Sequence, residues 1–229
     1  MEFNVGIYTV IQAFGLYIAI TETMVNTWII MAVLIIFALV VRNKLNSWQE
    51  VPTSKFQNVV EIMVETFDRY VISTAGKRLA YLAPWFFTVF LFLALSNISG
   101  LFFMRPPTAD WNATFPLAFV TFLLIQGLAL KHQAKDHISG LFQPIFLFFP
   151  MNVMGELAKP ISLSFRLFGN ILGGVILITL IYGMAPLILR LPLPIILHGY
   201  FDFAMGLLQA YVFVTLSMAF IAAGAGTTE

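Results

Sequence analysis

The sequence lacks cysteine and has few charged residues, and each shortage excludes a class of protein. None of its 229 residues is cysteine, so disulfides, thiolate metal sites and cysteine nucleophiles are excluded. Only 10% of the residues are charged and the formal net charge is +1, so the basic face typical of nucleic-acid-binding proteins is missing. No glycine loop that could cradle phosphates is present. We therefore expect no ATP site and no permanently bound cofactor or metal in this chain.

Apolar residues, by contrast, are abundant. They make up 60% of the chain, and the mean hydropathy is +0.91, whereas an average soluble domain is about 45–50% apolar and about 25% charged. The composition predicts an integral protein of the lipid bilayer. We expect an all-α fold with about five to six membrane helices, the last two long and tilted or bent, and an amphipathic helix on the cytoplasmic side.

The apolar runs predict a single membrane domain, 1–229. Its expected parts are an external N-terminus (1–23), a first span (24–41), an amphipathic cytoplasmic segment (46–80), a second span (85–103), a third span (115–130), a long helical segment (141–182) and a last long helix (193–221). As one helix, 141–182 would be about 60 Å long, twice the hydrocarbon thickness of about 30 Å. We therefore expect it to fold back, kink or lie steeply tilted, and Pro144, Pro150 and Pro160 offer places for a break.

The basic residues predict the orientation of the chain, because lysine and arginine are retained on the cytoplasmic side of a membrane. If the spans alternate, most basic residues of the first 140 fall on one side, and Arg105 falls on the other. The larger group comprises Arg42, Lys44, Lys55, Arg69, Lys77, Arg78, Lys131 and Lys135. We expect the N-terminus outside and the C-terminus in the cytoplasm.

One arginine needs an explanation. Arg166 lies in the apolar stretch "KPISLSFRLFGN", where an ionisable side chain costs at least about 2.5 to 3.5 kcal/mol on insertion. On the last helix, Asp202 and Gln209 are seven residues apart, which places them about 20° apart on an α-helix. Two interpretations stay open: Arg166 forms a static buried pair with Asp202, or it faces a mobile carboxylate supplied by another subunit.

A longer pattern resembles a known family. "KPISLSFRLFGNILGG", followed later by "LLQAYVFVTLS", resembles subunit a of the F-type ATP synthase, and the likeness covers nearly the whole chain. The resemblance implies a stator in the bacterial cell membrane, one copy per complex, beside a rotating c-ring and held by peripheral-stalk b subunits. It implies two ion half-channels that couple ion flow to rotation, for ATP synthesis or ATP-driven pumping. The expected ion is H⁺, with Na⁺ kept open.

The resemblance also suggests roles for individual residues. Arg166 matches the family's essential arginine, a fixed charge that faces the rotor. Asn170 and Gln209 match polar residues that hydrogen-bond the arginine or line water, although residues of this kind also join helices in membranes. Asp202 matches a position where the family has an acid or histidine of the outer half-channel. The alternative role for Asp202 is a static ion pair with Arg166. Glu156 matches an acid of some bacterial members, and its alternative is a local pair with Lys159.

Departures from the family pattern weaken parts of this assignment. Val175 stands where the family usually has a second acid or histidine, and Asn152 stands where other members have the acid that precedes the arginine. Asp202 is therefore the group that we expect to carry the outer pathway, together with water, His198 or Tyr200. A histidine such as His198 is more often packed in the protein interior than part of a proton relay. We expect His132 and His137 to be solvated in a cytoplasmic loop.

A different class of function also fits the charges. A self-contained ion-coupled secondary transporter would use an Arg/Asp site, but such folds usually show two repeated halves, and the intramembrane charges here lie only in the second half. A purely structural membrane protein would leave the cost of burying Arg166 unexplained.

Overall fold

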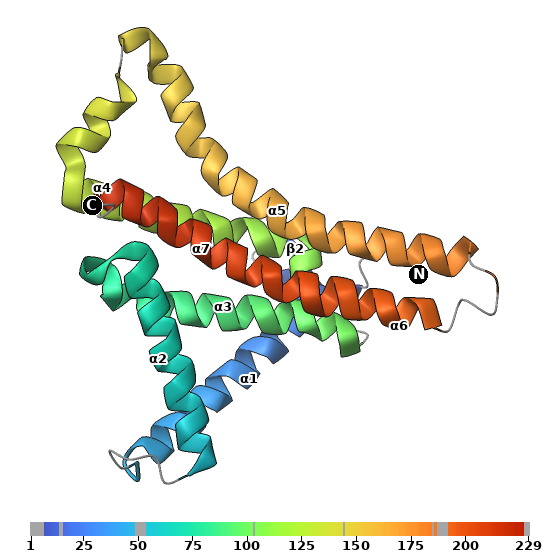
Figure 1. The fold of residues 1–229 in the computed structure, drawn as a ribbon. Coiled ribbons are helices and arrows are strands. Elements are labelled where there is room, and N and C mark those ends of the chain that lie inside the picture. Colours follow the sequence, from blue (N-terminus) through green and yellow to red (C-terminus); the bar gives the residue numbers. More distant parts are fainter. Residues whose placement is uncertain are drawn as a thin grey trace. The chain divides into compact units, whose positions relative to one another are not determined.

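The structure is a computed structural model that describes residues 7–13, 16–48, 54–102, 104–143, 145–184, 186 and 192–226. Helices dominate (Figure 1), which confirms the predicted all-α membrane class. A short antiparallel hairpin of β1 (Ile7–Ala13) and β2 (Leu16–Thr21), which the sequence did not predict, precedes the first helix. Residues 1–6, 14 and 15 of the predicted external segment, and residues 227–229 at the predicted cytoplasmic end, lie outside the described part.

Five helical stretches among the described residues are long and apolar enough to cross a membrane: Glu22–Leu45, Lys77–Phe102, Trp111–Leu141, Phe146–Met184 and Ile196–Ala225. The first of them, α1 (Glu22–Leu45), buries only Thr23, Asn26 and Ile30. Its remaining surface is apolar over most of the helix, as expected of a helix that faces lipid. The chain is a multi-pass membrane protein.

The helix α5 (Phe149–Met184) is continuous through Pro160, so the chain does not break at this residue. Pro150 is the second residue of the helix, where a missing N–H costs nothing because the first turn has no intrahelical acceptor. Pro144 lies outside the described residues. The chain turns before α5 instead, at the extended residue Ile145 and a 3₁₀ turn over Phe146–Phe148. At about 54 Å, α5 is much longer than the hydrocarbon thickness of about 30 Å.

The helix α4 (Trp111–Leu141) covers the predicted third span and also the predicted cytoplasmic loop that follows it. Its backbone leaves the helical region at Gln133, with φ −140° and ψ 47°. The helix therefore consists of two segments joined by a sharp kink at that residue. Neither proline nor glycine occupies the kink, so its position could not be predicted from a helix-breaking residue.

The last helical stretch changes its winding. It consists of α6 (Pro192–His198), a π-helix over Gly199–Met205, and α7 (Gly206–Ala225). Asp202 lies in the π-helical part, where the number of residues per turn is larger than in an α-helix. The angle of about 20° expected between Asp202 and Gln209 on an α-helix therefore does not apply. π-helical turns occur frequently at functional sites.

The chain divides into two compact units. Unit 1 contains Met1–Asn43, Leu91–Thr114 and Leu167–Ala210, and unit 2 contains Lys44–Phe90, Phe115–Arg166 and Tyr211–Glu229. Unit 1 buries several polar side chains, namely Thr23, Asn26, Ser96, Asn97, Ser99, Thr108, Thr114, Asp202 and Gln209. An unpaired buried polar group is costly, and most of these groups have hydrogen-bond partners, whereas Oγ of Ser96 and Nε2 of Gln209 have none among the described residues.

Unit 2 contains the predicted amphipathic helix, α2 (Lys55–Ala75). Ser54 caps its first turn by accepting a hydrogen bond from the backbone of Gln57 at 3.1 Å, and the helix ends at Gly76, whose φ is +86°. Glycine is the residue that adopts such a φ without strain. The ring of Phe67, in the middle of α2, lies 5.2 and 5.8 Å from the rings of Phe87 and Phe90 on α3 (Ala83–Ile98), so aromatic contacts hold α2 against α3.

Candidate functional site

Arg166 lies on the exposed side of α5. A buried stripe runs along this helix through Pro160, Leu163, Ser164, Leu167, Ile171, Gly174 and Ile178, whereas Arg166 is exposed. Among the described residues of unit 2, no carboxylate lies within ion-pair distance of Arg166. The helix therefore packs through its apolar stripe and leaves the guanidinium outside that packing.

Asn170 and Gln209 are brought together in unit 1. The Nδ2 of Asn170 donates a hydrogen bond to Oε1 of Gln209 at 2.7 Å. Gln209 is only 2% exposed, and its Nε2 is buried without a hydrogen-bond partner. A buried amide nitrogen without an acceptor costs free energy. The pair therefore joins α5 to α7 and keeps one donor available for another group.

Asp202 has a close partner on its own helical stretch. Nδ1 of His198 lies 2.6 Å from Oδ2 of Asp202, and Asp202 is only 7% exposed. In this unit the carboxylate is thus paired with a titratable imidazole. Val175, which replaces the family's usual second acid or histidine, is half-buried on α5. The two titratable groups of this region therefore belong to one helical stretch, one turn apart.

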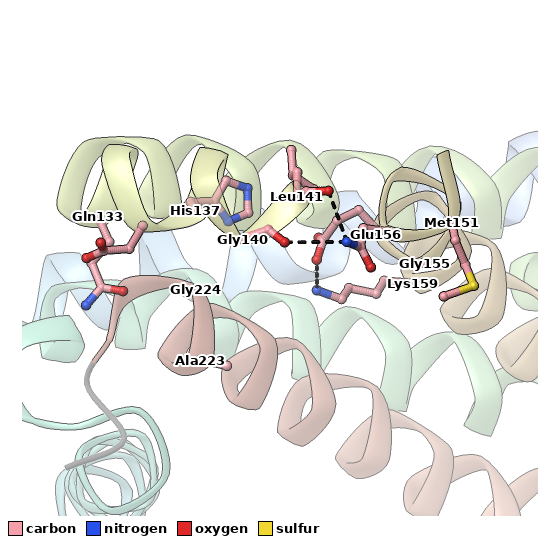
Figure 2. Close-up of a pocket in the computed structure, with 12 residues that line it drawn as sticks. Gln133, His137, Gly140, Leu141, Met151, Gly155, Glu156, Lys159, Ala223 and Gly224 are labelled. Carbon is pink, nitrogen blue, oxygen red and sulfur yellow. Dashed lines mark hydrogen bonds and ion pairs between the residues drawn. The ribbon is translucent and has the colours of Figure 1, made fainter. Parts of the chain in front are cut away.

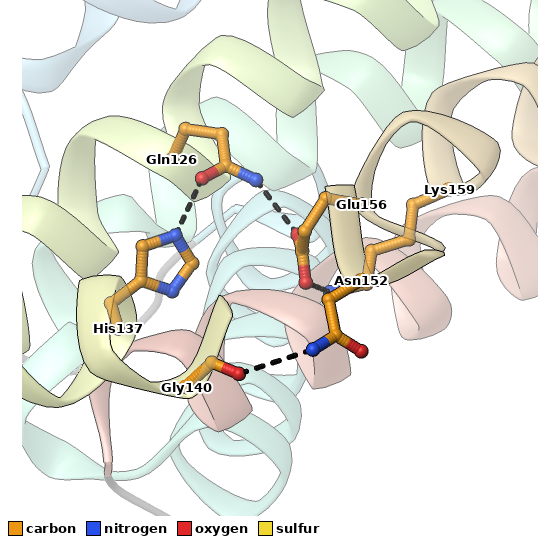
Figure 3. A network of polar contacts seen from close by, with 6 residues as sticks. All are labelled: Gln126, His137, Gly140, Asn152, Glu156 and Lys159. Atoms are coloured by element: carbon orange, nitrogen blue, oxygen red, sulfur yellow. Dashed lines mark hydrogen bonds and ion pairs between the residues drawn. The ribbon is translucent and has the colours of Figure 1, made fainter. Parts of the chain in front are cut away.

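Glu156 is the centre of a polar network in unit 2 (Figure 3). Its Oε1 accepts from Nζ of Lys159 at 2.5 Å and its Oε2 accepts from Nε2 of Gln126 at 2.8 Å. The local Glu156–Lys159 pair named in the sequence analysis therefore exists. The ammonium of Lys159 also lies 5.6 Å from the ring centroid of Phe220. Glu156 is held by two donors on different helices.

His137 extends this network, so its assignment as a solvated loop residue is wrong. Its Nε2 lies 2.7 Å from Oε1 of Gln126. In a straight helix, residues eleven positions apart would be separated by about 16 Å. The kink at Gln133 folds the end of α4 back, which brings the imidazole of His137 to Gln126. Because Gln126 donates to Glu156 through Nε2, its Oε1 faces His137, and the Nε2 of His137 has to carry the proton.

Asn152 caps the C-terminal end of α4, the segment that folds back after the kink at Gln133. Its Nδ2 lies 3.0 Å from the carbonyl oxygen of Leu141, 2.9 Å from that of Gln143 and 3.5 Å from that of Gly140. The last carbonyls of a helix lack intrahelical donors, and the amide of Asn152 supplies them for α4. A carboxylate at this position could not donate and would meet the negative end of the helix dipole. An acid at position 152 would therefore lose these hydrogen bonds.

These residues surround a cavity of ≈ 670 Å³ within unit 2 (Figure 2). The cavity lies among the end of α4, the first turns of α5 and the end of α7, and its lining includes Asp136, His137, Asn152, Glu156 and Lys159. Charged and amide groups facing a space of this size favour its occupation by water. Among the described residues, no group of three or more His, Asp or Glu is arranged to hold a metal ion.

Sequence reasoning missed three residues: Gln126 in unit 2, the partner of Glu156, and in unit 1 Asn97 and Gly100, which contact Gly206 and Asp202. Gln126 lies inside the apolar third span, where a single polar residue is a signal for a buried partner. Asn97 belongs to the stretch "LSNISG", and its side chain is 0% exposed. Each of these contacts joins segments distant in sequence, so no local pattern could reveal the partner.

Comparison with known proteins decides the family. Residues 24–222 match the family described as ATP synthase A chain. The chain belongs to this family. Subunit a of the ATP synthase from Moorella thermoacetica is 37% identical over 90% of this chain and 91% of its own length. The sodium-ion-specific subunit a of Propionigenium modestum is 32% identical over 95% of this chain and 79% of its own length. The ATP synthase subunit a of Acidothermus cellulolyticus is 36% identical over 76% of this chain and 66% of its own length.

Membership of the ATP synthase A chain family fixes the setting in which the chain works. Subunit a is a component of Fo, the membrane sector of the ATP synthase, so this chain acts in a complex with other Fo subunits, in ATP synthesis and ion transport. The family accounts for the multi-pass helical architecture, and it confirms the resemblance carried by "KPISLSFRLFGNILGG" and "LLQAYVFVTLS".

Proposed function

We propose that this chain forms two ion half-channels against a rotating c-ring and that Arg166 is the charge that separates them. The observation that carries the proposal is the placement of Arg166 on the exposed side of α5, with no carboxylate in ion-pair distance among the described residues of its unit. A charge in a membrane helix is expensive unless a partner or water meets it. A carboxylate on another subunit supplies that partner.

The surface around Arg166 supports an approach by another helix. Ser162, Gly169 and Gly173 are exposed on the same side of α5, and an added Cβ on either glycine meets no atom within 4 Å. Small residues let the backbones of membrane helices come close together. A rotor helix can therefore bring its carboxylate to the guanidinium.

The chemistry of the guanidinium explains how it couples ion flow to rotation. It stays protonated at any accessible pH. A rotor carboxylate travels through lipid only while a bound ion neutralises it. When it meets Arg166 it releases that ion into one half-channel, and it takes up another ion from the second half-channel after it leaves. The fixed positive charge also prevents ions from passing directly between the two channels.

We assign the cytoplasmic half-channel to the cavity around Glu156. Lys131 and Lys135 lie on the end of α4 that contributes to this cavity, and basic residues are retained on the cytoplasmic side. Asp136 and Glu156 supply negative charge along the lining, which attracts cations. The N-terminus then lies outside, and the C-terminus lies in the cytoplasm of the bacterial cell.

We assign the outer half-channel to Asp202, with His198 as its partner and Asn170 and Gln209 as polar groups further along. Asp202 lies against Gly100, near the end of the second span, and Arg105 follows on the predicted external side. The contact of 2.6 Å between His198 and Asp202 allows a proton to be shared between the two groups. His198 and Asp202, on one helical stretch, then take the place of the acid or histidine that the family usually has at the position of Val175.

The proposed ion is H⁺. The sodium-ion-specific subunit a of Propionigenium modestum is a relative of this chain, so Na⁺ remains the alternative. Sodium needs several oxygen ligands and water, whereas a proton needs groups that titrate. The pairing of Asp202 with His198 and the contact of Gln126 with His137 place imidazoles beside both proposed paths, which favours H⁺.

The other expectations complete the proposal. The ion is translocated and not held as a cofactor, and the catalytic work on ATP takes place in other subunits. One copy of the chain serves each complex. The peripheral-stalk b subunits bind on the cytoplasmic side, where α2 presents Val59, Ile62 and Met63 as exposed apolar residues.

The test is ATP-driven ion uptake into vesicles, measured separately for H⁺ with a pH-sensitive dye and for Na⁺ with a labelled ion. Vesicles with the whole complex should acidify in an ATP-dependent way, and vesicles with the purified chain alone should transport neither ion. Transport by the purified chain alone would favour the self-contained transporter. Uptake of Na⁺ without acidification would overturn the choice of ion and leave the stator function intact.

A further inference from the structure

The carboxylate of Asp202 lies directly against the backbone of Gly100. A Cβ added at Gly100 would lie 2.7 Å from Cγ and 2.8 Å from Oδ2 of Asp202, whereas non-bonded carbon atoms rest at about 3.5–4.0 Å. The φ of Gly100 does not lie in the left-handed region. A side chain at this position would therefore displace the carboxylate of Asp202, although the backbone conformation itself does not call for glycine.

A second contact fixes the same two segments. The Nδ2 of Asn97 donates to the carbonyl oxygen of Gly206 at 2.7 Å, and Oδ1 of Asn97 accepts from the hydroxyl of Thr108 at 2.6 Å. Asn97 is 0% exposed. A Cβ added at Gly206 would lie 2.7 Å from Cβ of Asn97. Here too a glycine permits the close approach.

The two contacts together set a register. Asn97 and Gly100 are three residues apart at the end of α3 and in the 3₁₀ turn that follows it (Ser99–Phe102), and they meet Gly206 and Asp202 in reverse order. The segments therefore pack antiparallel and are joined at two points. Gly206 is the first residue of α7, so the donor from Asn97 fixes the junction of the π-helix with α7.

The neighbouring residue of the π-helix is also packed closely. A Cβ added at Gly174 on α5 would lie 3.1 Å from ring atoms of Phe201, the residue before Asp202. The segment that carries Asp202 thus makes two close glycine contacts, one with α5 and one with the turn after α3. Because protein interiors are close-packed, both contacts restrict the position of this segment.

We propose that Asn97 and Gly100 are positioning residues for Asp202 in the outer half-channel. Asn97 fixes the junction of the π-helix and α7 against the end of α3. The absence of a side chain at Gly100 leaves the space that the carboxylate of Asp202 occupies when it contacts His198. The inference rests on the proposed function of Asp202. Neither residue exchanges an ion itself, so both act through the place and the pairing of that carboxylate.

The experiment compares Gly100→Ala with Gly183→Ala in the assembled complex reconstituted into vesicles. Gly183 is a matched control because it is exposed near the end of α5 and an added Cβ meets nothing within 4 Å. We expect Gly100→Ala to lower the initial rate of ATP-driven acidification about ten-fold, which corresponds to about 1.4 kcal/mol. We also expect a shift in the pH at half-maximal pumping, because the carboxylate loses its place beside His198. Gly183→Ala should change neither quantity.

A merely structural role would not move the pH profile. If Gly100→Ala pumps like Gly183→Ala at every pH, the inference is overturned. If Gly100→Ala fails to assemble, the amount of complex on a native gel is compared with that of Gly100→Ala/Asp202→Ala. Recovery in the double variant supports the inference because the clashing carboxylate is gone, and no recovery overturns it.

The proposed function of Asp202 is tested separately by Asp202→Asn, which keeps the shape of the side chain. Normal pumping by Asp202→Asn would remove Asp202 from the ion path, whatever Gly100→Ala does. Strongly reduced pumping by Asp202→Asn, together with normal pumping by Gly100→Ala, would retain the proposed path and reject the positioning role.

Discussion

Gln126 and Glu156, thirty residues apart in sequence, are joined by a hydrogen bond of 2.8 Å from Nε2 to Oε2. The same amide accepts from His137 through its oxygen, at 2.7 Å. One side chain of a membrane helix thus links the acid of α5 to a histidine on the folded end of α4 (Figure 3). Because an amide has one donor end and one acceptor end, the link fixes the orientation of all three groups.

The first prediction concerns this link. Gln126→Leu should lower passive proton conduction through Fo about ten-fold, because a hydrogen bond to a charged group contributes about 1.5–3 kcal/mol and Glu156 is then held by Lys159 alone. The measurement is the decay of a pH gradient in vesicles stripped of the catalytic sector. Leu124→Ala, a change two residues away on α4, serves as the control. Unchanged conduction in Gln126→Leu would show that the link does not support the cytoplasmic path.

The second prediction concerns the acid itself. Glu156→Gln keeps the side chain's size and should reduce conduction more than Glu156→Asp, because Asp retains a charge that attracts and binds cations. Lys159→Met should act in the opposite direction, since it removes the ammonium that neutralises Glu156 at 2.5 Å. Conduction and ATP-driven pumping are measured on the same vesicles. Equal conduction in Glu156→Gln and Glu156→Asp would mean that the carboxylate serves only as a local pair.

Asn152 gives a prediction about stability. Asn152→Ala should lower the free energy of unfolding by about 1–2 kcal/mol, a typical loss for one or two hydrogen bonds at a helix end. Asn152→Asp should be worse than Asn152→Ala, because its carboxylate faces the carbonyl oxygens of Leu141 and Gln143 at about 3 Å. Thermal denaturation of the purified complex compares the two. If the complex with Asn152→Asp were as stable as wild type, the capping role would be contradicted.

The existence of the membrane-spanning helices was predictable from the sequence, and their long-range partners were not. Hydropathy reports which segments enter a membrane, and the spacing of Arg166 and Asn170 places both on one side of α5. Hydropathy carries no information about a kink such as that at Gln133, where no proline or glycine occurs. The contacts of His137 with Gln126, and of Gly100 with Asp202, depend on the kink and on helix packing. They became visible only in three dimensions.

The pair of Asn170 and Gln209 provides a fourth prediction. Asn170→Ala removes the donor to Oε1 of Gln209 and leaves the entire buried amide unsatisfied, which should cost about 1–3 kcal/mol. Asn170→Ala/Gln209→Met should recover part of this loss, because the double variant leaves no buried polar group without a partner. A double-mutant cycle on thermal stability measures the coupling. Additive effects would show that the two residues do not interact.

Tyr70 gives a prediction about alkaline pH. Burial raises the pKa of the Tyr70 phenol, whose hydroxyl is hydrogen-bonded to Thr215. The unfolded chain ionises first, at a pH of about 10, so the stability that the neutral phenol contributes is fully present below that pH. It is lost as the pH rises toward the folded-state pKa. Tyr70→Phe should weaken this alkaline loss of stability, whereas Tyr81→Phe, at an exposed tyrosine, should not.

The central claim is that the charge of Arg166 couples ion flow to rotation, and Arg166→Ala tests it most directly. ATP-driven pumping is measured in vesicles that contain equal amounts of assembled complex, with Arg69→Ala as a control that removes an exposed cation on α2. We expect Arg166→Ala to abolish pumping and Arg69→Ala to retain it. Normal pumping by the fully assembled Arg166→Ala complex would contradict the account.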